Sequence, residues 1–178
     1  AALKDLSKLR KLFLDQTKVG DVGLSKLASL LELTHLSLRG TKITGEGITA
    51  IAGLMKLSVL HLDDTKMTDR GLYYLYKVKS LTVLTLDNAP ITDVGTPYLV
   101  GLAELGTLSL AKTKVTNKGM VKLRALKALH SINLSGTEIG DDGLAPFDGN
   151  YRIRSLGLAQ TKVTDKGLEH FDAMQDME

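Results

Sequence analysis

Residues 57–80 read LSVLHLDDTKMTDRGLYYLYKVKS, and residues 81–104 read LTVLTLDNAPITDVGTPYLVGLAE. The two stretches align without an insertion or deletion. The same 24-residue pattern recurs in seven repeats, which open at Leu9, Leu33, Leu57, Leu81, Leu105, Leu129 and Ile153. A fixed period between about 20 and 50 residues is typical of a stacked array in which each repeat contacts its neighbours. The sequence therefore predicts a single repeat domain over residues 1–178.

The apolar positions predict the structure of one repeat, when its 24 positions are numbered from the opening residue. Positions 1, 4 and 6 are apolar in every repeat, as in Leu81, Leu84 and Leu86. The spacing of positions 4 and 6 is that of a strand with one buried face, so position 5 points to solvent. Position 11 is a further buried anchor, and positions 16, 19 and 22 have helical spacing. We predict a short strand, a turn and a helix of about two to three turns in each repeat.

Three polar positions recur. Position 9 is Thr in every repeat except the one with Ala89, and we expect its hydroxyl to satisfy the buried turn and to form a ladder through the stack. A Thr-Asp pair, such as Thr68-Asp69, is predicted to cap the start of the helix. Position 15 is always Gly, which costs about 1 kcal/mol relative to Ala near a helix start. We therefore expect close approach of neighbouring backbones there, or a turn that excludes a Cβ.

Composition excludes several classes of protein. With 43% hydrophobic and 24% charged residues, the chain is typical of a soluble domain with a long core. A net charge of +3 does not favour a nucleic-acid binder. The absence of Cys excludes disulfides and cysteine metal sites. No apolar run reaches the roughly 18 residues of a membrane span. No signal peptide is visible, and the compartment stays open, with a slight preference for the cytoplasm.

The two ends look like partial repeats. Leu3 and Leu6 match the last positions of a preceding repeat, and Met177 falls where an eighth repeat would open. Neither end has the polar character of a capping repeat. We therefore interpret the chain as a piece of a longer protein.

The pattern L-x-x-L-x-L-x-x-[N/C/T] resembles the leucine-rich repeat family, and the T-D-x-G-L run resembles its cysteine-containing-like subtype, found in F-box substrate receptors and related bacterial proteins. Here Thr stands where that subtype commonly has Cys or Asn, and its repeats often run slightly longer. The resemblance implies an α/β fold: a right-handed solenoid arc with a parallel sheet on the concave face and short helices on the convex face. It also implies that a macromolecule, usually a protein, binds the concave sheet.

On such a fold, the large, charged and apolar outward side chains belong to repeats 1 to 4, whereas repeats 5 to 7 carry mostly small ones. Interface hot spots favour large side chains. We predict a partner-binding surface formed by Phe13, His35, Arg39, Val59, His61, Asp63, Val83 and Asp87. The alternative is that these are ordinary solvated residues, with the valines supporting the sheet.

The acidic group Asp63, Asp64 and Asp87 raises two sharper hypotheses. Like charges on strands about 4.8 Å apart raise one pKa, as in carboxylate pairs that perform acid–base chemistry. With His61 they could instead hold a divalent cation. Because a flat open sheet lacks a cleft that excludes water, we favour an acidic patch that meets a basic partner. We predict no catalytic residue, no metal site and no cofactor.

Two further surfaces stand out. A row of lysines at position 10 is interpreted as a solubilising edge. Tyr73, Tyr74 and Tyr98, together with Tyr76, lie on the predicted helices of repeats 3 and 4. Because Tyr is favoured at interfaces, these residues form a second candidate surface on the convex side. Pro97, with Thr96 as a cap, predicts a late helix start in repeat 4, and Pro146 followed by Asp148-Gly149-Asn150 predicts a shortened helix in repeat 6. These two repeats are expected to be the least regular.

The leading prediction is a non-enzymatic protein-binding module, because the chain has no phosphate loop, no metal-ligand spacing and no nucleophile beside a base. It is expected to bind a protein partner rather than nucleic acid or membrane, and its oligomeric state is open. One alternative is a substrate-receptor segment of an F-box ubiquitin ligase, or a bacterial effector that mimics one. Another is the binding domain of an enzyme whose catalytic domain lies outside this chain.

Overall fold

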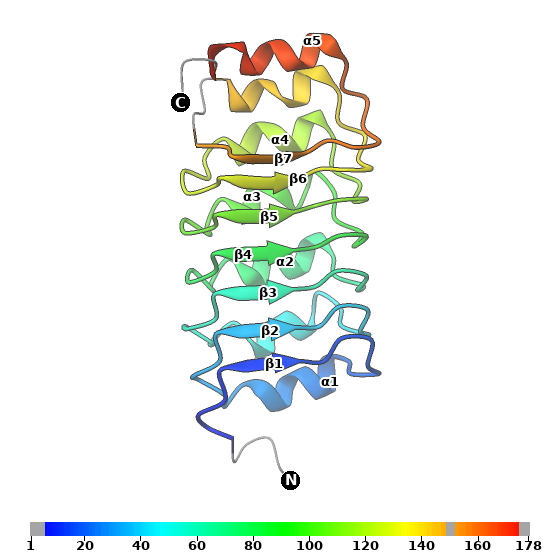
Figure 1. Ribbon diagram of the computed structural model, residues 1–178. Coiled ribbons are helices and arrows are strands. Elements are labelled where there is room, and N and C mark those ends of the chain that lie inside the picture. Colours follow the sequence, from blue (N-terminus) through cyan, green and yellow to red (C-terminus); the bar gives the residue numbers. More distant parts are fainter. Residues whose placement is uncertain (1–5, 149–151, 175–178) are drawn as a thin grey trace.

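The computed structural model describes residues 6–148 and 152–174, and it shows a curved stack of repeats (Figure 1). Each repeat contributes one short strand, and the seven strands form one parallel sheet in chain order. They are β1 (Lys11–Phe13), β2 (His35–Ser37), β3 (Val59–His61), β4 (Val83–Thr85), β5 (Thr107–Ser109), β6 (Ser131–Asn133) and β7 (Ser155–Gly157). The predicted α/β solenoid with an open parallel sheet is confirmed.

Residues that pair in neighbouring strands are one repeat, or 24 residues, apart in the sequence. Val59 pairs with Val83 and Leu60 with Leu84, and the same offset holds between every pair of neighbouring strands. Leu60, Leu62, Leu84 and Leu86 are fully buried in one continuous core between the sheet and the helices. The offset in sequence therefore fixes the direction in which each side chain points.

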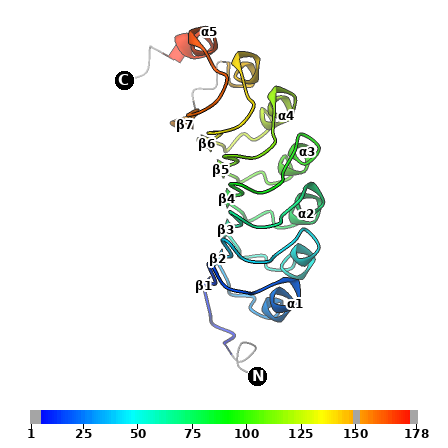
Figure 2. The same ribbon diagram turned by 90° about the vertical axis from the view of Figure 1, so that its right-hand side faces the viewer.

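Short helical segments cover the other face of the sheet, and Figure 2 shows them on the outer side of the arc, with the strands on its inner side. The α-helices are α1 (Asp21–Leu24), α2 (Asp69–Leu75), α3 (Thr96–Leu99), α4 (Asn117–Leu123) and α5 (Asp165–Leu168). The 3-10 helices are η2 (Ser25–Leu27), η3 (Gly47–Ala50), η4 (Asp141–Gly143), η5 (Ala145–Phe147) and η6 (Glu169–Met174). Across these described ranges, no helix is both long and apolar enough to cross a bilayer.

Most helices are shorter than predicted. Only α2 and α4 are α-helical over 7 residues, which is about two turns. The late start in repeat 4 is confirmed, but Thr96 is the first residue of α3 rather than its cap, and its hydroxyl donates to the Asp93 carbonyl at 3.1 Å. Repeat 6 has only 3-10 segments, as expected, although Gly149 and Asn150 lie outside the described residues, as do Leu3 and Met177.

The expectation missed repeat 2, whose convex side carries only the 3-10 helix η3. Its sequence around Glu46 has a glycine on each side, Gly45 and Gly47. Each glycine costs a helix about 0.8–1 kcal/mol relative to Ala. Two of them within one turn account for the loss of α-helix here.

The position-9 threonines satisfy the turn within their own repeat. Thr41 donates to the Leu38 carbonyl at 2.5 Å and Thr65 to the Leu62 carbonyl at 2.6 Å. The same bond recurs at Thr17, Thr113, Thr137 and Thr161. The predicted bond to the buried turn is confirmed, and it recurs along the stack, with each hydroxyl donating to the carbonyl three residues earlier in its own repeat.

Carboxylates at position 13 join successive repeats on the convex side. Asp93 accepts hydrogen bonds from the backbone N–H of Thr116 through Oδ1 and from its hydroxyl through Oδ2, both at 2.7 Å. The same arrangement links Asp21 to Thr44, Asp69 to Thr92 and Asp141 to Thr164. The Asp of the Thr-Asp pair therefore serves the next repeat. The predicted threonine cap is present at Thr116, whose hydroxyl accepts from the Lys118 N–H at 3.3 Å. It is wrong for Thr68 and Thr164, which stand at the N-cap without a side-chain hydrogen bond.

This carboxylate explains the invariant glycine at position 15. A Cβ added to Gly119 would lie 2.5 Å from Asp93 Oδ1, and one added to Gly167 would lie 2.5 Å from Asp141 Oδ1. Repeat 2 differs, because Gly45 stands at its position 13, and a Cβ on Gly71 would lie 2.7 Å from the Gly45 Cα. The predicted close approach of neighbouring backbones holds between Gly71 and Gly45. Except at Gly45, the approaching group is mainly a side chain.

Candidate protein-binding surface

The predicted surface residues lie on the outward side of the first four strands. Phe13, His35, Val59, His61 and Val83 belong to the strands, and the three residues at position 7 follow the strand ends: Arg39, Asp63 and Asp87. They differ in exposure, since Phe13 is 64% exposed whereas Asp63 is only 7% exposed. The other strand residues and Asp87 are half-buried, and Arg39 is exposed.

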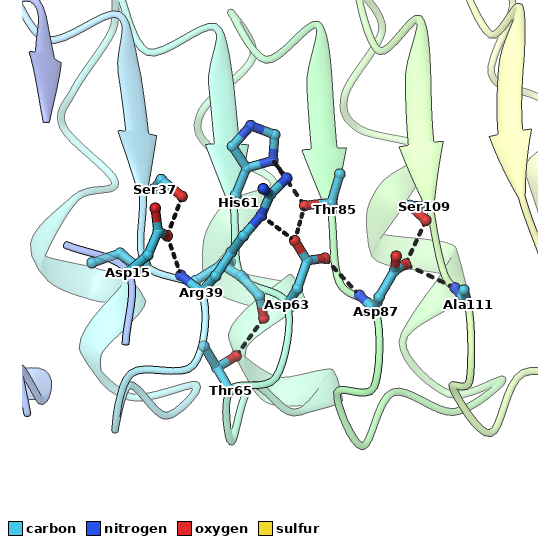
Figure 3. A network of polar contacts seen from close by, with 12 residues as sticks. Asp15, Ser37, Arg39, His61, Asp63, Thr65, Thr85, Asp87, Ser109 and Ala111 are labelled. Atoms are coloured by element: carbon cyan, nitrogen blue, oxygen red, sulfur yellow. Dashed lines mark hydrogen bonds and ion pairs between the residues drawn. The ribbon is translucent and has the colours of Figure 1, made fainter. Parts of the chain in front are cut away.

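A repeated polar contact connects the strand ends on this face (Figure 3). Asp15 accepts a hydrogen bond from the Arg39 backbone N–H at 2.9 Å and another from the Ser37 hydroxyl. Asp87 accepts from the Ala111 N–H at 2.9 Å and from the Ser109 hydroxyl. A position-7 carboxylate thus binds the position-5 hydroxyl and the position-7 amide of the next repeat. We call this contact the aspartate clamp.

The aspartate clamp is replaced between repeats 2 and 3. Arg39 stands where the carboxylate would be, and His61 stands where the hydroxyl would be. Arg39 Nε donates to Asp63 Oδ2 at 2.7 Å, and its Nη2 lies 3.1 Å from His61 Nδ1. An ion pair and an imidazole contact therefore join these two repeats on the concave face.

Asp63 receives donors from both sides. Its Oδ2 also accepts from the Thr85 hydroxyl at 2.7 Å, and its Oδ1 accepts from the Asp87 backbone N–H at 2.9 Å. A buried carboxylate is costly unless it is paired and hydrogen-bonded, and all of these partners stabilise it. Asp63 therefore positions Arg39 and Thr85, and little of it is accessible to a partner.

The His61 ring lies between the side chains of Arg39 and Thr85. Its Nδ1 lies 2.9 Å from Thr85 Oγ1 and 3.1 Å from Arg39 Nη2. The Thr85 hydroxyl gives its one proton to Asp63, so its oxygen can only accept from Nδ1, whereas an Arg39 N–H can only donate to Nδ1. The tautomer of the ring decides which of the two contacts is a hydrogen bond. Burial lowers the pKa of His61, and the Arg39 guanidinium lowers it further, against the opposing effect of Asp63 and Asp15.

Each of the three acidic residues accepts hydrogen bonds from the following repeat. The Asp63 and Asp87 carboxylates are turned to different donors, each in the following repeat (Figure 3). The third acid, Asp64, accepts from the Asn88 side chain at 2.8 Å. Over residues 6–148 and 152–174, no group of three or more His, Asp or Glu side chains is placed to hold a metal ion.

The convex tyrosines do meet. The Tyr73 ring lies 5.4 Å from those of Tyr74 and Tyr98, edge to face, and 5.8 Å from that of Tyr76, measured between centroids. Tyr74 and Tyr98 also pack against the core, and Arg70 Nε donates to the Tyr74 hydroxyl at 3.2 Å. Tyr73, at 48% exposed, and Tyr76, at 37%, are the rings open to solvent.

Sequence reasoning missed the partners that organise the surface. Asp15, Ser37, Thr85 and Ser109 were not singled out, although they hold the position-7 side chains. A signal was present: an acid at position 7 is followed in the next repeat by Ser or Thr at position 5.

Comparisons with known proteins agree with this geometry. A family model described as Leucine Rich repeat matches residues 32–52 and 127–147. No curated protein sequence matches the chain.

Solved structures share the fold. The crystal structure of an internalin (inlF) from Listeria monocytogenes superposes with a TM-score of 0.72 at 23% identity; the match covers 99% of this chain and 55% of the internalin. The chain thus spans about half the length of that protein. Internalin C2 of the same organism gives a TM-score of 0.72 at 24% identity, over 96% of this chain and 79% of the other. At these identities the likeness shows the fold.

Proposed function

Because this chain is a leucine-rich repeat protein, we propose that it is a non-enzymatic protein-binding module whose partner contacts the concave face of repeats 1 to 4. That face is an inward-curving parallel sheet with outward side chains at fixed spacing. Such extended concave surfaces are what solenoids offer to macromolecular partners.

The observation that carries this proposal is the exchange of the aspartate clamp for Arg39 and His61. Departures from a locally consistent pattern are expected at functional sites. The Arg39 side chain is 46% exposed, yet Asp63 fixes its guanidinium. An arginine that is already ordered loses less conformational entropy on binding, and Arg is enriched among interface hot spots.

Phe13 supplies an apolar anchor beside this polar group. It lies on β1, which pairs with β2, so its outward ring sits next to Ser37. A ring that is 64% exposed has no role in the core. Burying it against a partner would remove a large apolar area from water. Repeats 5 to 7 offer only small side chains at the same positions of their strands, such as Ser109, Asn133 and Gly157.

Affinity capture followed by mass spectrometry tests the proposal. The concave triple variant Phe13→Ser, Arg39→Ser and His61→Ser leaves Asp63 in place, so that its hydrogen bonds to Thr85 and Asp87 remain. The matched convex triple variant is Val22→Ser, Val94→Ser and Val121→Ser, at residues 79%, 68% and 61% exposed. We expect proteins captured by the wild type to be lost with the concave variant and kept with the convex one.

Thermal unfolding of each variant, followed by circular dichroism, checks that both remain folded. A partner that is retained by the concave variant contradicts the proposal. If the partner is instead lost with the variant Tyr73→Ser and Tyr76→Ser, it binds the convex tyrosines rather than the concave face.

A further inference from the structure

A shallow hollow lies where the chain enters β6 and β7, away from the surface described above. Its volume is about 380 Å³, and Lys127, Ala128, His130, Arg152 and Arg154 line it. Lys127 and Ala128 lie between α4 and β6, His130 directly precedes β6, and Arg152 and Arg154 precede β7. The hollow therefore sits at one edge of the sheet, between repeats 5 and 7.

The lining is basic. Four of its five side chains are Lys, Arg or His, and none is acidic. Among residues 6–148 and 152–174, the Lys127 ammonium and the Arg154 guanidinium form no ion pair. Glu104, on the same edge of the preceding repeat, does not line the hollow. Asp148, in repeat 6, is occupied by His170 at 2.7 Å.

Two contacts shape the hollow. One arm of Arg152, Nη1, donates to the Lys127 carbonyl at 2.6 Å, which holds the guanidinium against the loop. His130 Nδ1 lies 3.1 Å from the Ala128 carbonyl, so its proton sits on that nitrogen. The ring occupies space that Gly106 leaves open, since a Cβ on Gly106 would collide with it. The Arg152 and His130 side chains are therefore held in place before any ligand arrives.

We propose that this hollow binds an acidic peptide segment carried by the protein partner. The inference rests on the proposed function, because the hollow borders the concave sheet and would anchor a partner beyond its contacts with repeats 1 to 4. Arginine guanidinium groups match the geometry of carboxylates. Small-molecule sites are mostly apolar, whereas this lining is almost entirely charged. Several cations side by side suit a run of Asp or Glu side chains, and complementary charge sets the register of such a contact.

Fluorescence anisotropy with a labelled hexaglutamate peptide tests the site without the natural partner. The variant Lys127→Glu and Arg154→Glu reverses two exposed charges whose side chains hold nothing in place. The matched control, Lys77→Glu and Lys118→Glu, makes the same change in charge at exposed residues of repeats 3 and 5. We expect the hollow variant to raise the Kd for hexaglutamate at least about tenfold and the control to change it less than about twofold. Binding should also weaken from about 50 to about 300 mM salt.

Three results would overturn the inference. Equal losses in the hollow and control variants would show a diffuse charge effect. Displacement of the peptide by an equal concentration of inorganic phosphate would show a site for small oxyanions, and equal affinity for a hexathymidylate oligonucleotide would show a general polyanion site. The concave triple variant separates the two proposals, because it should bind hexaglutamate like the wild type. If partner capture fails while hexaglutamate binding persists, only the proposed function is lost.

Discussion

The Asp63 carboxylate accepts a 2.9 Å hydrogen bond from the backbone N–H of Asp87, the residue at the same position of the next repeat. A side chain in one repeat thus satisfies the main chain of the next, at the end of a strand of only 3 residues. The same carboxylate holds Arg39. Asp63 therefore contributes both to the junction between two repeats and to the shape of the candidate surface.

Replacing Asp63 by Asn should destabilise the protein. The change removes the charge that pairs with Arg39 and places an amide N–H₂ group against donors of Thr85 or Asp87. We expect the free energy of unfolding to fall by about 1–3 kcal/mol, measured by urea denaturation. The matched variant Asp64→Asn alters an exposed neighbour whose φ of 56° suits Asn. A loss for Asp64→Asn as large as that for Asp63→Asn would refute the role given to Asp63.

Adding one methyl group at position 15 should destabilise the contact between two neighbouring repeats. In Gly119→Ala the new Cβ would meet Asp93 Oδ1, and that carboxylate is tied to Thr116. We expect a loss of about 1–3 kcal/mol in the free energy of unfolding. The matched control is Gly53→Ala, where the added Cβ has no neighbour within 4 Å. Equal thermal midpoints for the two variants would contradict the close approach between repeats.

Stability should fall on mild acidification because of His61. Its pKa is lowered in the folded state by burial and by Arg39, whereas in the unfolded chain it is about 6.5. As the pH falls below about 6.5, the unfolded chain binds the proton first, so the free energy of unfolding decreases until the pH reaches the lower folded-state value. Urea denaturation at several pH values measures this slope.

The variant His61→Gln should have a smaller slope in that window. An unchanged slope in His61→Gln would mean that other groups set the response to pH.

The two phenylalanines should respond in opposite ways to truncation. Phe147 is 1% exposed and is the largest of the fully buried side chains, so Phe147→Ala should cost about 3–5 kcal/mol. Phe13 is 64% exposed, and Phe13→Ala should change stability by less than about 0.5 kcal/mol while weakening partner binding. Thermal unfolding monitored by circular dichroism compares them. A large loss of stability for Phe13→Ala would mean that the ring serves the core.

Much of the fold could be predicted because the same repeat positions carry apolar residues in every repeat, and these positions fix the strands and the core. The pairing of Leu60 with Leu84 follows from the period alone, since a one-residue slip would turn every buried side chain outward. Helix length did not follow, because repeats of equal length carry 3-10 or α-helical segments according to local residues such as Gly45 and Gly47. Position 8 has positive φ in every repeat, including Lys112 and Gln160. Gly40, Asn88 and Gly136 at that position were an unused signal for a left-handed turn.

The candidate surface was predictable in place but not in detail. Alternation put Phe13, His35, Val59, His61 and Val83 on the outward face, and they lie there. The direction of the longer side chains was not encoded by spacing. Asp63 turns back to the next repeat and is buried, since an unpaired strand-end amide and a hydroxyl lie within its reach. The rotamer of such a side chain depends on the hydrogen-bond donors around it, and these donors cannot be identified from the spacing of residues in the sequence.

Repeat 2 lacks an acid at both linking positions, with Arg39 at position 7 and Gly45 at position 13. Its junction with repeat 3 keeps the main-chain bonds, such as the one from the Leu38 N–H to the His61 carbonyl, and its side-chain links include the ion pairs Arg39–Asp63 and Arg70–Glu46. Because ion pairs take the place of carboxylate–amide bonds at this junction, added salt should weaken it more than the junction of repeats 3 and 4, where Asp63 and Asp69 bind backbone N–H groups.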